Sequence, residues 1–415
     1  MDYRIWILEK LIQKYENSKL FTDKGSIRKV SIRLQDEEAL NKHMERVEEK
    51  EEFLSALTNL EQDGLINFSW VRYETGNLVD RIWLIADEDK IKECYQLLGR
   101  IPKGNIIDSL HQLLITYLEK VVDDGEIRLF LKEQEKYIRQ RRKIPRFFTE
   151  DMAFNEDILK CLMYLAGNSS EIQERILSSH LYGDSKYFER FVKGKLVSIL
   201  RVIKKEKGEE FVEEECLREK GLVKWPEVLE FTGNVKIRLE DGSCIDYGLE
   251  VYGAYINSIT VEKVEDASLF GVSRVLFIEN KANYVWYVSK KRMKNELVIY
   301  HGGFYSPTKG KWFEKLYEAG KKCLDEIKYY HWSDIDVGGF RIFNRLKESI
   351  VLELLPYKMD IESLEKNRDK GMLMEEPYRK ILKEMGEDTR YAIFSNLIHR
   401  MLELNIRLEQ EQLLY

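Results

Sequence analysis

"YYHWSDIDVGGFRIF" occupies residues 329–343 and joins an apolar, aromatic run to two aspartates and two glycines. The run predicts a buried strand that leads into Asp334 and Asp336. Gly338 and Gly339 lack side chains and therefore allow a helix to begin close to the two acids. The stretch predicts a strand, an acidic turn and a helix in immediate succession.

Strands and helices alternate throughout residues 271–415. Predicted strands lie in RVLFIE (274–279), ELVIYHGG (296–303) and IKYYHW (327–332), and PYKMD (356–360) is a fourth candidate. Such alternation predicts a parallel sheet with helices on both faces. Functional residues in such sheets gather at the carboxyl ends of the strands.

Three acids occupy those predicted strand ends, because Glu279 closes one strand and Asp334 and Asp336 follow another, 55 residues later (334 − 279 = 55). Three carboxylates at one edge repel each other unless a cation lies between them. Oxygen ligands without His or Cys suit Mg²⁺ or Mn²⁺ better than zinc. Such a site stabilises charge on a phosphoryl group, which predicts phosphodiester cleavage. The alternative is that the aspartates only cap the following helix.

The rest of the chain predicts further parts, so we expect a multidomain protein of α/β and α+β class. Helical spacing up to Leu60, alternation from Ile66 to Trp70 and a returning strand near Ile82 are typical of a helix with a two-stranded wing. Short strands surround an Asp241-Gly242 turn. The predicted parts are a winged-helix-like domain (1–100), a helical basic region (101–210), a small β-rich connecting region (211–270) and a catalytic domain (271–415).

The most basic stretch is KYIRQRRKIPRFF, residues 136–148. Phosphate binding is one interpretation, because each neutralised phosphate releases counterions. A solvated helix end or a contact with an acidic partner is the other. The candidate DNA-binding residues are Lys136, Arg139, Arg141, Arg142, Lys143 and Arg146. In the winged-helix-like part, the acidic run MERVEEKEE weakens a major-groove interpretation and leaves packing or protein contact as the alternative.

Whole-chain composition gives no further sign of a nucleic-acid partner. The 415 residues are 44% hydrophobic and 34% charged, with a formal charge of −6. Five cysteines are scattered without a CxxC pair, and the first residues form an amphipathic pattern rather than a signal peptide. No apolar run approaches the roughly 18 residues of a membrane span. We therefore expect a cytoplasmic protein with no membrane partner.

Several motifs follow one another in order: LYGDSKYFE, VLFIENKANY, HGGF, SDIDVGGFRIFNRL, PYKMD and RLEQEQL. A strand ending in Glu, with DxD and Gly two strands later, resembles the Toprim pattern of topoisomerases, primases and the topoisomerase VI A subunit. The ordered set, over residues 175–415, is similar to the Toprim-containing JetD family of Wadjet anti-plasmid systems. The chain departs from the expected pattern at Val337-Gly338, where a His or similar residue is expected before Gly-Phe, and this leaves the fine geometry open.

The resemblance implies a Toprim domain and a DNA endonuclease in which Glu279, Asp334 and Asp336 hold one or two Mg²⁺ or Mn²⁺ ions. It also adds weaker candidates, whose alternative roles are a polar helix end and an exposed surface position. These are Glu409, Glu411 and Asp360 as further metal ligands or contacts, and Lys281 as a phosphate contact.

The same resemblance implies partners and a substrate. The substrate is double-stranded plasmid DNA, delivered by an SMC–kleisin–winged-helix complex and hydrolysed by water. Cutting both strands needs two sites, which predicts a homodimer. Two alternatives stay open: a transesterase like the topoisomerase VI A subunit, which attacks with a tyrosine, and a catalytically inactive DNA-binding or assembly subunit.

Overall fold

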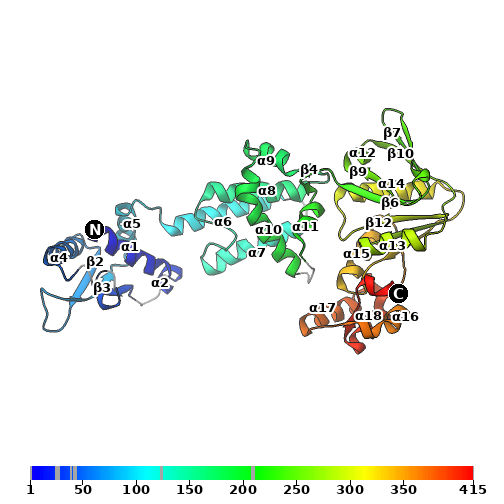
Figure 1. Ribbon diagram of the computed structural model, residues 1–415. Coiled ribbons are helices and arrows are strands. Elements are labelled where there is room, and N and C mark those ends of the chain that lie inside the picture. The colour runs from blue at the N-terminus through cyan, green and yellow to red at the C-terminus, as the bar shows by residue number, and fades with distance from the viewer. Residues whose placement is uncertain are drawn as a thin grey trace. The chain divides into compact units, whose positions relative to one another are not determined.

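The computed structural model places the chain in two compact units, which are described separately (Figure 1). The first comprises residues 1–124 with 128–156, and the second 125–127 with 157–415. The structure describes residues 2–23, 29–37, 40, 44–121, 125–206 and 211–414. Across these ranges, no helix is both long and apolar enough to cross a bilayer. The predicted four-part division stays a prediction.

The first unit begins with helices packed on a three-stranded antiparallel sheet of order β1-β3-β2. The strand pair predicted after the second helix is confirmed, with Ile66 opposite Leu84. Its winged-helix character stays a prediction. The elements here are α1 (Tyr3–Glu16), α2 (Lys19–Thr22), β1 (Ser31–Arg33), α4 (Val47–Gln62), β2 (Ile66–Trp70), β3 (Val79–Leu84) and α5 (Glu88–Leu97).

The middle of the chain is helical, as its apolar periodicity predicts. Two short strands, β4 (Ile172–Gln173) and β5 (Leu222–Val223), pair in parallel. The helices are α6 (Lys103–Lys120), α7 (Glu126–Arg141), α8 (Met152–Gly167), α9 (Glu174–Tyr182), α10 (Lys193–Glu206) and α11 (Glu213–Glu219).

The second unit is built on a six-stranded mixed sheet of order β14-β13-β11-β12-β6-β9. Its strands are β6 (Val228–Thr232), β9 (Ala254–Asn257), β11 (Arg274–Ile278), β12 (Glu296–Tyr300), β13 (Lys328–Trp332) and β14 (Leu355–Pro356). The first four strands of that order are mutually parallel, whereas β6 is antiparallel to β12. The predicted parallel sheet is therefore present within a larger mixed one.

The predicted β-rich connecting region divides between two sheets, which corrects the expectation of one small sheet. Strands β6 and β9 join the main sheet, because β6 pairs with β12. Only β7 (Val235–Leu239), β8 (Cys244–Asp246) and β10 (Val264–Leu269) form a separate three-stranded sheet. Strands β6 and β12 are far apart in the sequence, so their pairing cannot be recognised from the local alternation of apolar and polar residues.

Helices and a short two-stranded antiparallel sheet complete the second unit, and its largest buried side chains include Trp312 and Trp332. Toward the C-terminus, α16 to α18 gather together in Figure 1, orange to red. The remaining elements are α12 (Ser258–Glu262), α13 (Lys281–Lys290), α14 (Pro307–Lys321), α15 (Val337–Ser349), α16 (Ile361–Lys366), β15 (Met372–Leu373), α17 (Glu376–Glu387), α18 (Ser395–Leu404) and β16 (Ile406–Arg407).

Candidate active site at the carboxyl ends of the parallel strands

Parallel pairing brings the three predicted acids to the same edge of the main sheet. Ile278 of β11 lies opposite Trp332 of β13, so Glu279 and the acidic turn leave the sheet side by side. The backbone N–H of Glu279 donates to the carbonyl of Trp332 at 2.9 Å and continues the ladder into the site. The strand-end positions inferred from the sequence are therefore neighbours in space.

Each of the three carboxylates disfavours the ionised form of its neighbours. Burial, followed by the charges of Asp334 and Asp336, raises the pKa of Glu279 well above its usual range. Burial, followed by Asp336, raises the pKa of Asp334 to about 7. The Oε2 atom of Glu279 is fully buried and accepts no hydrogen bond within the described part of the chain. An unpaired buried carboxylate oxygen is costly, and a cation beside it would remove the cost.

Asp336 also caps α15, so the alternative interpretation of the DxD motif holds for one of its two acids. Its side chain accepts a hydrogen bond from the N–H of Gly339 at 2.7 Å. Its other oxygen, Oδ2, lies 3.8 Å from a guanidinium nitrogen of Arg407. The cap fixes the orientation of the Asp336 carboxylate. This carboxylate can still have a second role at the strand ends.

Gly339 lets α15 begin against the acidic turn. A Cβ at this position would collide with the carbonyl of Asp334 and would lie 2.7 Å from Oγ of Ser333. At Gly338 the nearest atom to a Cβ would be Oδ1 of Asp336, at 3.2 Å. The close approach expected from the glycine pair therefore depends mainly on the second glycine.

A residue that the sequence interpretation missed, Gln410, ties the site together. Its side chain donates to the carbonyl of Trp332 at 2.9 Å and accepts from the N–H of Asn280 at 2.8 Å. Its own N–H donates to Oδ1 of Asp334 at 2.6 Å. Gln410 is completely buried, and it lies within the RLEQEQL motif that drew attention for its glutamates alone. The sequence offered only an amide residue between two glutamates, and neither its burial nor its distant partners could be recognised from it.

The C-terminal segment reaches the site through backbone pairing as well. The N–H of Ile335 donates to the carbonyl of Leu408 at 2.9 Å, and the N–H of Leu408 donates back at 3.2 Å. This antiparallel bridge holds the acidic turn against residues that follow β16.

The weaker metal-ligand candidates occupy different places. Glu409 and Glu411 are exposed beside Gln410, and both raise the pKa of Asp334, after the larger effects of burial and Asp336. Glu411 accepts a hydrogen bond from Asn280 at 2.5 Å. Asp360 is exposed and caps α16 by accepting from the N–H of Ser363 at 2.7 Å. The two glutamates are near the site, and Asp360 has a structural role of its own.

Lys281 stands at the first position of α13, directly after the site. It pairs with the buried Glu230, and its ammonium lies 4.7 Å from the ring centre of Tyr300. Its side chain remains half exposed. This cation is therefore partly neutralised, and its contact with phosphate stays a prediction.

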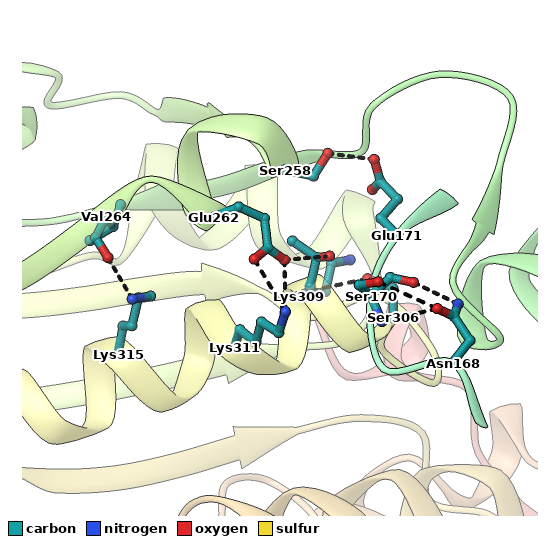
Figure 2. Close-up of polar contacts among 11 residues, drawn as sticks. Asn168, Ser170, Glu171, Ser258, Glu262, Val264, Ser306, Lys309, Lys311 and Lys315 are labelled. Atoms are coloured by element: carbon teal, nitrogen blue, oxygen red, sulfur yellow. Dashed lines mark hydrogen bonds and ion pairs between the residues drawn. The ribbon is translucent and has the colours of Figure 1, made fainter. Parts of the chain in front are cut away.

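Strand β12 pairs with β11 on the side opposite β13, and α14 holds the loop that follows β12. The N–H of His301 donates to the carbonyl of Ile278 at 2.7 Å. Ser306 caps α14 by accepting from the N–H of Lys309 at 3.1 Å, as Figure 2 shows. The ammonium of the buried Lys309 donates to the carbonyl of His301 at 3.1 Å. The strand end beside Glu279 is therefore held rigidly.

The loop before α9 fastens the helices of the second unit to its sheet (Figure 2). Oγ of Ser258, at the start of α12, donates to Glu171 at 2.7 Å. The other oxygen of Glu171 accepts from the N–H of Glu227, just before β6, at 3.2 Å. Burial raises the pKa of this carboxyl group.

The six predicted DNA-binding cations lie in the first unit, at the end of α7 and in the segment after it, and all six are exposed. Arg142 forms two bonds to Asp108, at 3.1 and 3.2 Å. Arg139 lies 3.7 Å from Glu135, and Arg146 lies over the ring of Phe147. The other three cations form no ion pair within the described ranges; they are Lys136, Arg141 and Lys143.

The donor chemistry at the strand ends fits Mg²⁺ or Mn²⁺. In the part of the chain that the structure describes, no three His, Cys, Asp or Glu side chains converge closely enough to hold one ion together. Magnesium, however, usually keeps several waters and is held by one or two carboxylates. The buried, unbonded Oε2 of Glu279 and the raised pKa values of Glu279 and Asp334 show that the charges of these carboxylates are poorly compensated in the described structure, and a divalent cation would fit this donor set.

Comparison with known proteins gives two matches. A family model described as "Wadjet protein JetD, C-terminal" matches residues 233–415. The whole chain is 30% identical over 421 residues to "Wadjet protein JetD" of Bacillus cereus (strain Q1), with 99% of this chain and 98% of that protein covered. The second match extends the similarity to the first unit.

Proposed function

The chain belongs to the family of Wadjet protein JetD, and from that membership we propose that it is a metal-dependent DNA endonuclease that cleaves plasmid DNA in anti-plasmid defence. The observation that carries the proposal is the meeting of Glu279, Asp334 and Asp336 at adjacent parallel strand ends. Their charges are mutually unfavourable, and Oε2 of Glu279 has no partner in the described structure.

The chain's own residues position the reaction. Glu279 and Asp334 supply the carboxylates that would hold Mg²⁺ or Mn²⁺, and Asp336 is held in place by Gly339 at the start of α15. A bound divalent cation stabilises charge on the phosphoryl group and lowers the pKa of a water molecule. Gln410 fixes the acidic turn through its N–H bond to Asp334.

Water is the nucleophile in this proposal. Tyr300 ends β12 next to β11, and its charge would interact with that of Glu279. Burial, followed by Glu215, raises the pKa of Tyr300, which disfavours an attacking phenolate. We expect Tyr300→Phe to cleave DNA normally, and a tyrosyl–DNA adduct trapped under denaturing conditions would show that the nucleophile is a tyrosine.

The proposed partners are an SMC–kleisin–winged-helix complex that delivers circular DNA, and a second copy of this chain. A cut through both strands needs two reaction sites, and each chain has one set of three acids. Light scattering of the protein with DNA should give the mass of a dimer. Only monomers at the concentration that cleaves DNA would refute the dimer.

Cleavage of supercoiled plasmid by the purified protein, alone and with its SMC partners, tests the proposal. Wild type should require Mg²⁺ or Mn²⁺, and Glu279→Ala and Asp336→Ala should abolish the product. Glu348→Ala, on the exposed face of α15, is the control and should cleave normally. Cleavage in the presence of a chelator, or by both site variants, would refute the site. Plasmid restriction that survives both variants in cells would instead favour an inactive assembly subunit.

A further inference from the structure

The end of β14 brings a lysine to the edge of the sheet that carries the acids. Strand β14 pairs in parallel with β13, and Pro356 lies opposite His331. Lys358 and Ser333 each follow these paired residues by two positions, so both lie just beyond the carboxyl ends of their strands. Oγ of Ser333 donates to Sδ of Met359 at 3.3 Å. The segment after β14 therefore packs directly against the acidic turn.

Two lysines bind the C-terminal turn, which is the 3₁₀ helix Gln410–Leu413. The ammonium of Lys358 donates to the carbonyl of Leu413 at 3.0 Å. The ammonium of Lys370 donates to the preceding carbonyl, that of Gln412, at 3.1 Å. Because the two carbonyls are consecutive in the chain, the two ammonium groups are close to each other.

The C-terminal turn connects these lysines to the acids. It begins at Gln410, whose N–H donates to Oδ1 of Asp334 at 2.6 Å. The ammonium of Lys358 also lies 4.7 Å from the ring centre of Trp332, the last residue of β13. Since β14 flanks β13 on the side away from β11, the lysines adjoin the acidic turn from that side.

Neither lysine forms an ion pair in the described part of the chain. Lys358 makes a single hydrogen bond there, to a carbonyl, and the second partner of Lys370 is the neutral Oδ1 of Asn367, at 3.2 Å. Other cations near the strand ends lie beside carboxylates: Lys281 beside Glu230, Lys309 beside Glu227 and Arg345 beside Glu219. Lys358 and Lys370 are therefore cations whose charge is not compensated in this way.

Two further lysines add positive charge to the same region. Lys366 and Lys291 are exposed, and they lower the pKa of Lys358, after the larger effect of burial. Like charges that gather in this way repel one another, and an anion that lies against them relieves the repulsion. The electrostatics therefore agree with the geometry of the C-terminal turn in favouring a negatively charged ligand.

A purely structural role accounts for only part of this arrangement. Lysines near the end of a helix can satisfy its last carbonyls, as Lys358 and Lys370 do here. An ammonium group has three N–H donors, however. With one hydrogen bond for Lys358 and two for Lys370, both keep donors for another acceptor. Phosphate oxygens are acceptors that lysine commonly binds.

We propose that Lys358 and Lys370 hold the sugar–phosphate backbone of DNA beside the acidic turn. The inference rests on the proposed function, because it takes DNA as the substrate, and it adds residues that position the strand for cleavage. Phosphate contacts fix the register of a nucleic acid without reading its sequence. The second unit thus has a DNA contact of its own, apart from the basic segment of the first unit.

The test is fluorescence anisotropy of the full-length protein with labelled duplex DNA, in a chelator and at several salt concentrations. Lys358→Gln combined with Lys370→Gln should weaken binding by about 10- to 60-fold near 100 mM salt. The slope of log K against log salt should become shallower by about 2, since two phosphate contacts are lost. Lys358→Arg combined with Lys370→Arg keeps both charges and should keep the wild-type slope.

Lys321→Gln combined with Lys322→Gln is the matched control, because it removes the same charge from the end of α14. Glu318 and Asp266 engage these lysines at 3.0 and 2.7 Å. Helix α14 leads into β13, so its end lies at the opposite edge of the sheet from the acids. The control should change the slope by less than about 0.5.

Acetylation of the wild-type lysines, followed by mass spectrometry, gives a measurement that needs no variant. DNA should slow the modification of Lys358 and Lys370 and leave that of Lys321 and Lys322 unchanged. Equal modification with and without DNA would overturn the inference.

A wild-type slope for the double glutamine variant, or an equal loss in the double arginine variant, would also overturn the inference. The lysines would then serve as caps of the C-terminal turn or as a contact for an acidic protein. DNA binding that depends on Lys358 and Lys370, without any cleavage in Mg²⁺ or Mn²⁺, would support the inference and count against the proposed nuclease.

Discussion

Glu279 is an acid whose charge is strongly disfavoured at the strand ends. Its carboxylate is surrounded by the charges of Asp334 and Asp336, and one of its oxygens has no hydrogen bond in the described structure. A raised carboxyl pKa means that the ionised form destabilises the folded protein near neutral pH. The same property would favour the divalent cation that we propose for this site.

Glu279→Gln should therefore raise the melting temperature of the metal-free protein, because it removes one of the mutually repelling charges. We expect a gain on the order of 1 kcal/mol, which is roughly 2–4 °C for a unit of this size. The same variant should lose the further rise that Mn²⁺ causes in wild type. Differential scanning calorimetry with and without Mn²⁺ measures both.

Glu348→Gln is the control, since Glu348 is exposed on α15. It should match wild type in both conditions. A Glu279→Gln protein that melts lower than wild type without metal, and still responds to Mn²⁺, would contradict this account of the carboxylate.

Two buried histidines next to the site give a pH dependence. His301 and His331 are fully buried, with ring centres 5.2 Å apart. Burial lowers the pKa of His301 to about 3 and that of His331 well below its usual value. Both stay neutral in the folded protein while unfolded histidines take up protons below about pH 6.5. Their contribution to stability is therefore complete above that pH and is lost as the pH falls below it.

His331→Phe should make the free energy of unfolding less sensitive to acid, by up to about 1.4 kcal/mol per pH unit between pH 6 and 4. Urea denaturation at several pH values measures the slope. His399→Phe changes an exposed histidine on α18 and should keep the wild-type slope. An unchanged slope for His331→Phe would show that this histidine is protonated in the folded state.

At the scale of elements, α15 must start within contact distance of the acidic turn. Gly339→Ala would drive a Cβ into the Asp334 carbonyl, which is backbone and cannot move aside cheaply. We expect a loss of about 1–3 kcal/mol and weaker Mn²⁺ binding. Gly338→Ala is the matched comparison, because its nearest neighbour is a side-chain oxygen at 3.2 Å. Equal losses for the two alanines in thermal melts would refute the packing argument.

The sequence was sufficient to predict the parallel strands and the acids that end them, because apolar runs and strand-end charges are local signals. It did not place β6 and β9 in the main sheet, since antiparallel pairing of Val298 with Thr232 depends on contacts distant in sequence. Gln410 was missed for the same reason. Its partners Asn280 and Trp332 lie far earlier in the chain.

At the scale of the whole molecule, the first unit carries the exposed basic segment and the second carries the acids. If the segment binds DNA, the cations that form no ion pair with any described residue should matter most. Changing Lys136, Arg141 and Lys143 together to alanine should weaken DNA binding and make the slope of log K against log salt shallower by about 2–3. Fluorescence anisotropy with duplex DNA at several salt concentrations gives both values.

Arg142→Ala is the control for that experiment, because Asp108 already occupies the guanidinium. It should change the slope of log K against log salt by less than about 1, which corresponds to one phosphate contact. A triple variant that keeps the wild-type slope would assign the segment to a solvated surface or a protein contact.

Binding of a divalent cation by Glu279 and the aspartates that follow β13 is tested by anomalous diffraction from a crystal grown with Mn²⁺. We expect a manganese peak within about 2.2 Å of a carboxylate oxygen of Glu279 and of Asp334 or Asp336. A crystal with ordered side chains and no manganese peak at these carboxylates, at a concentration that supports cleavage, would contradict it.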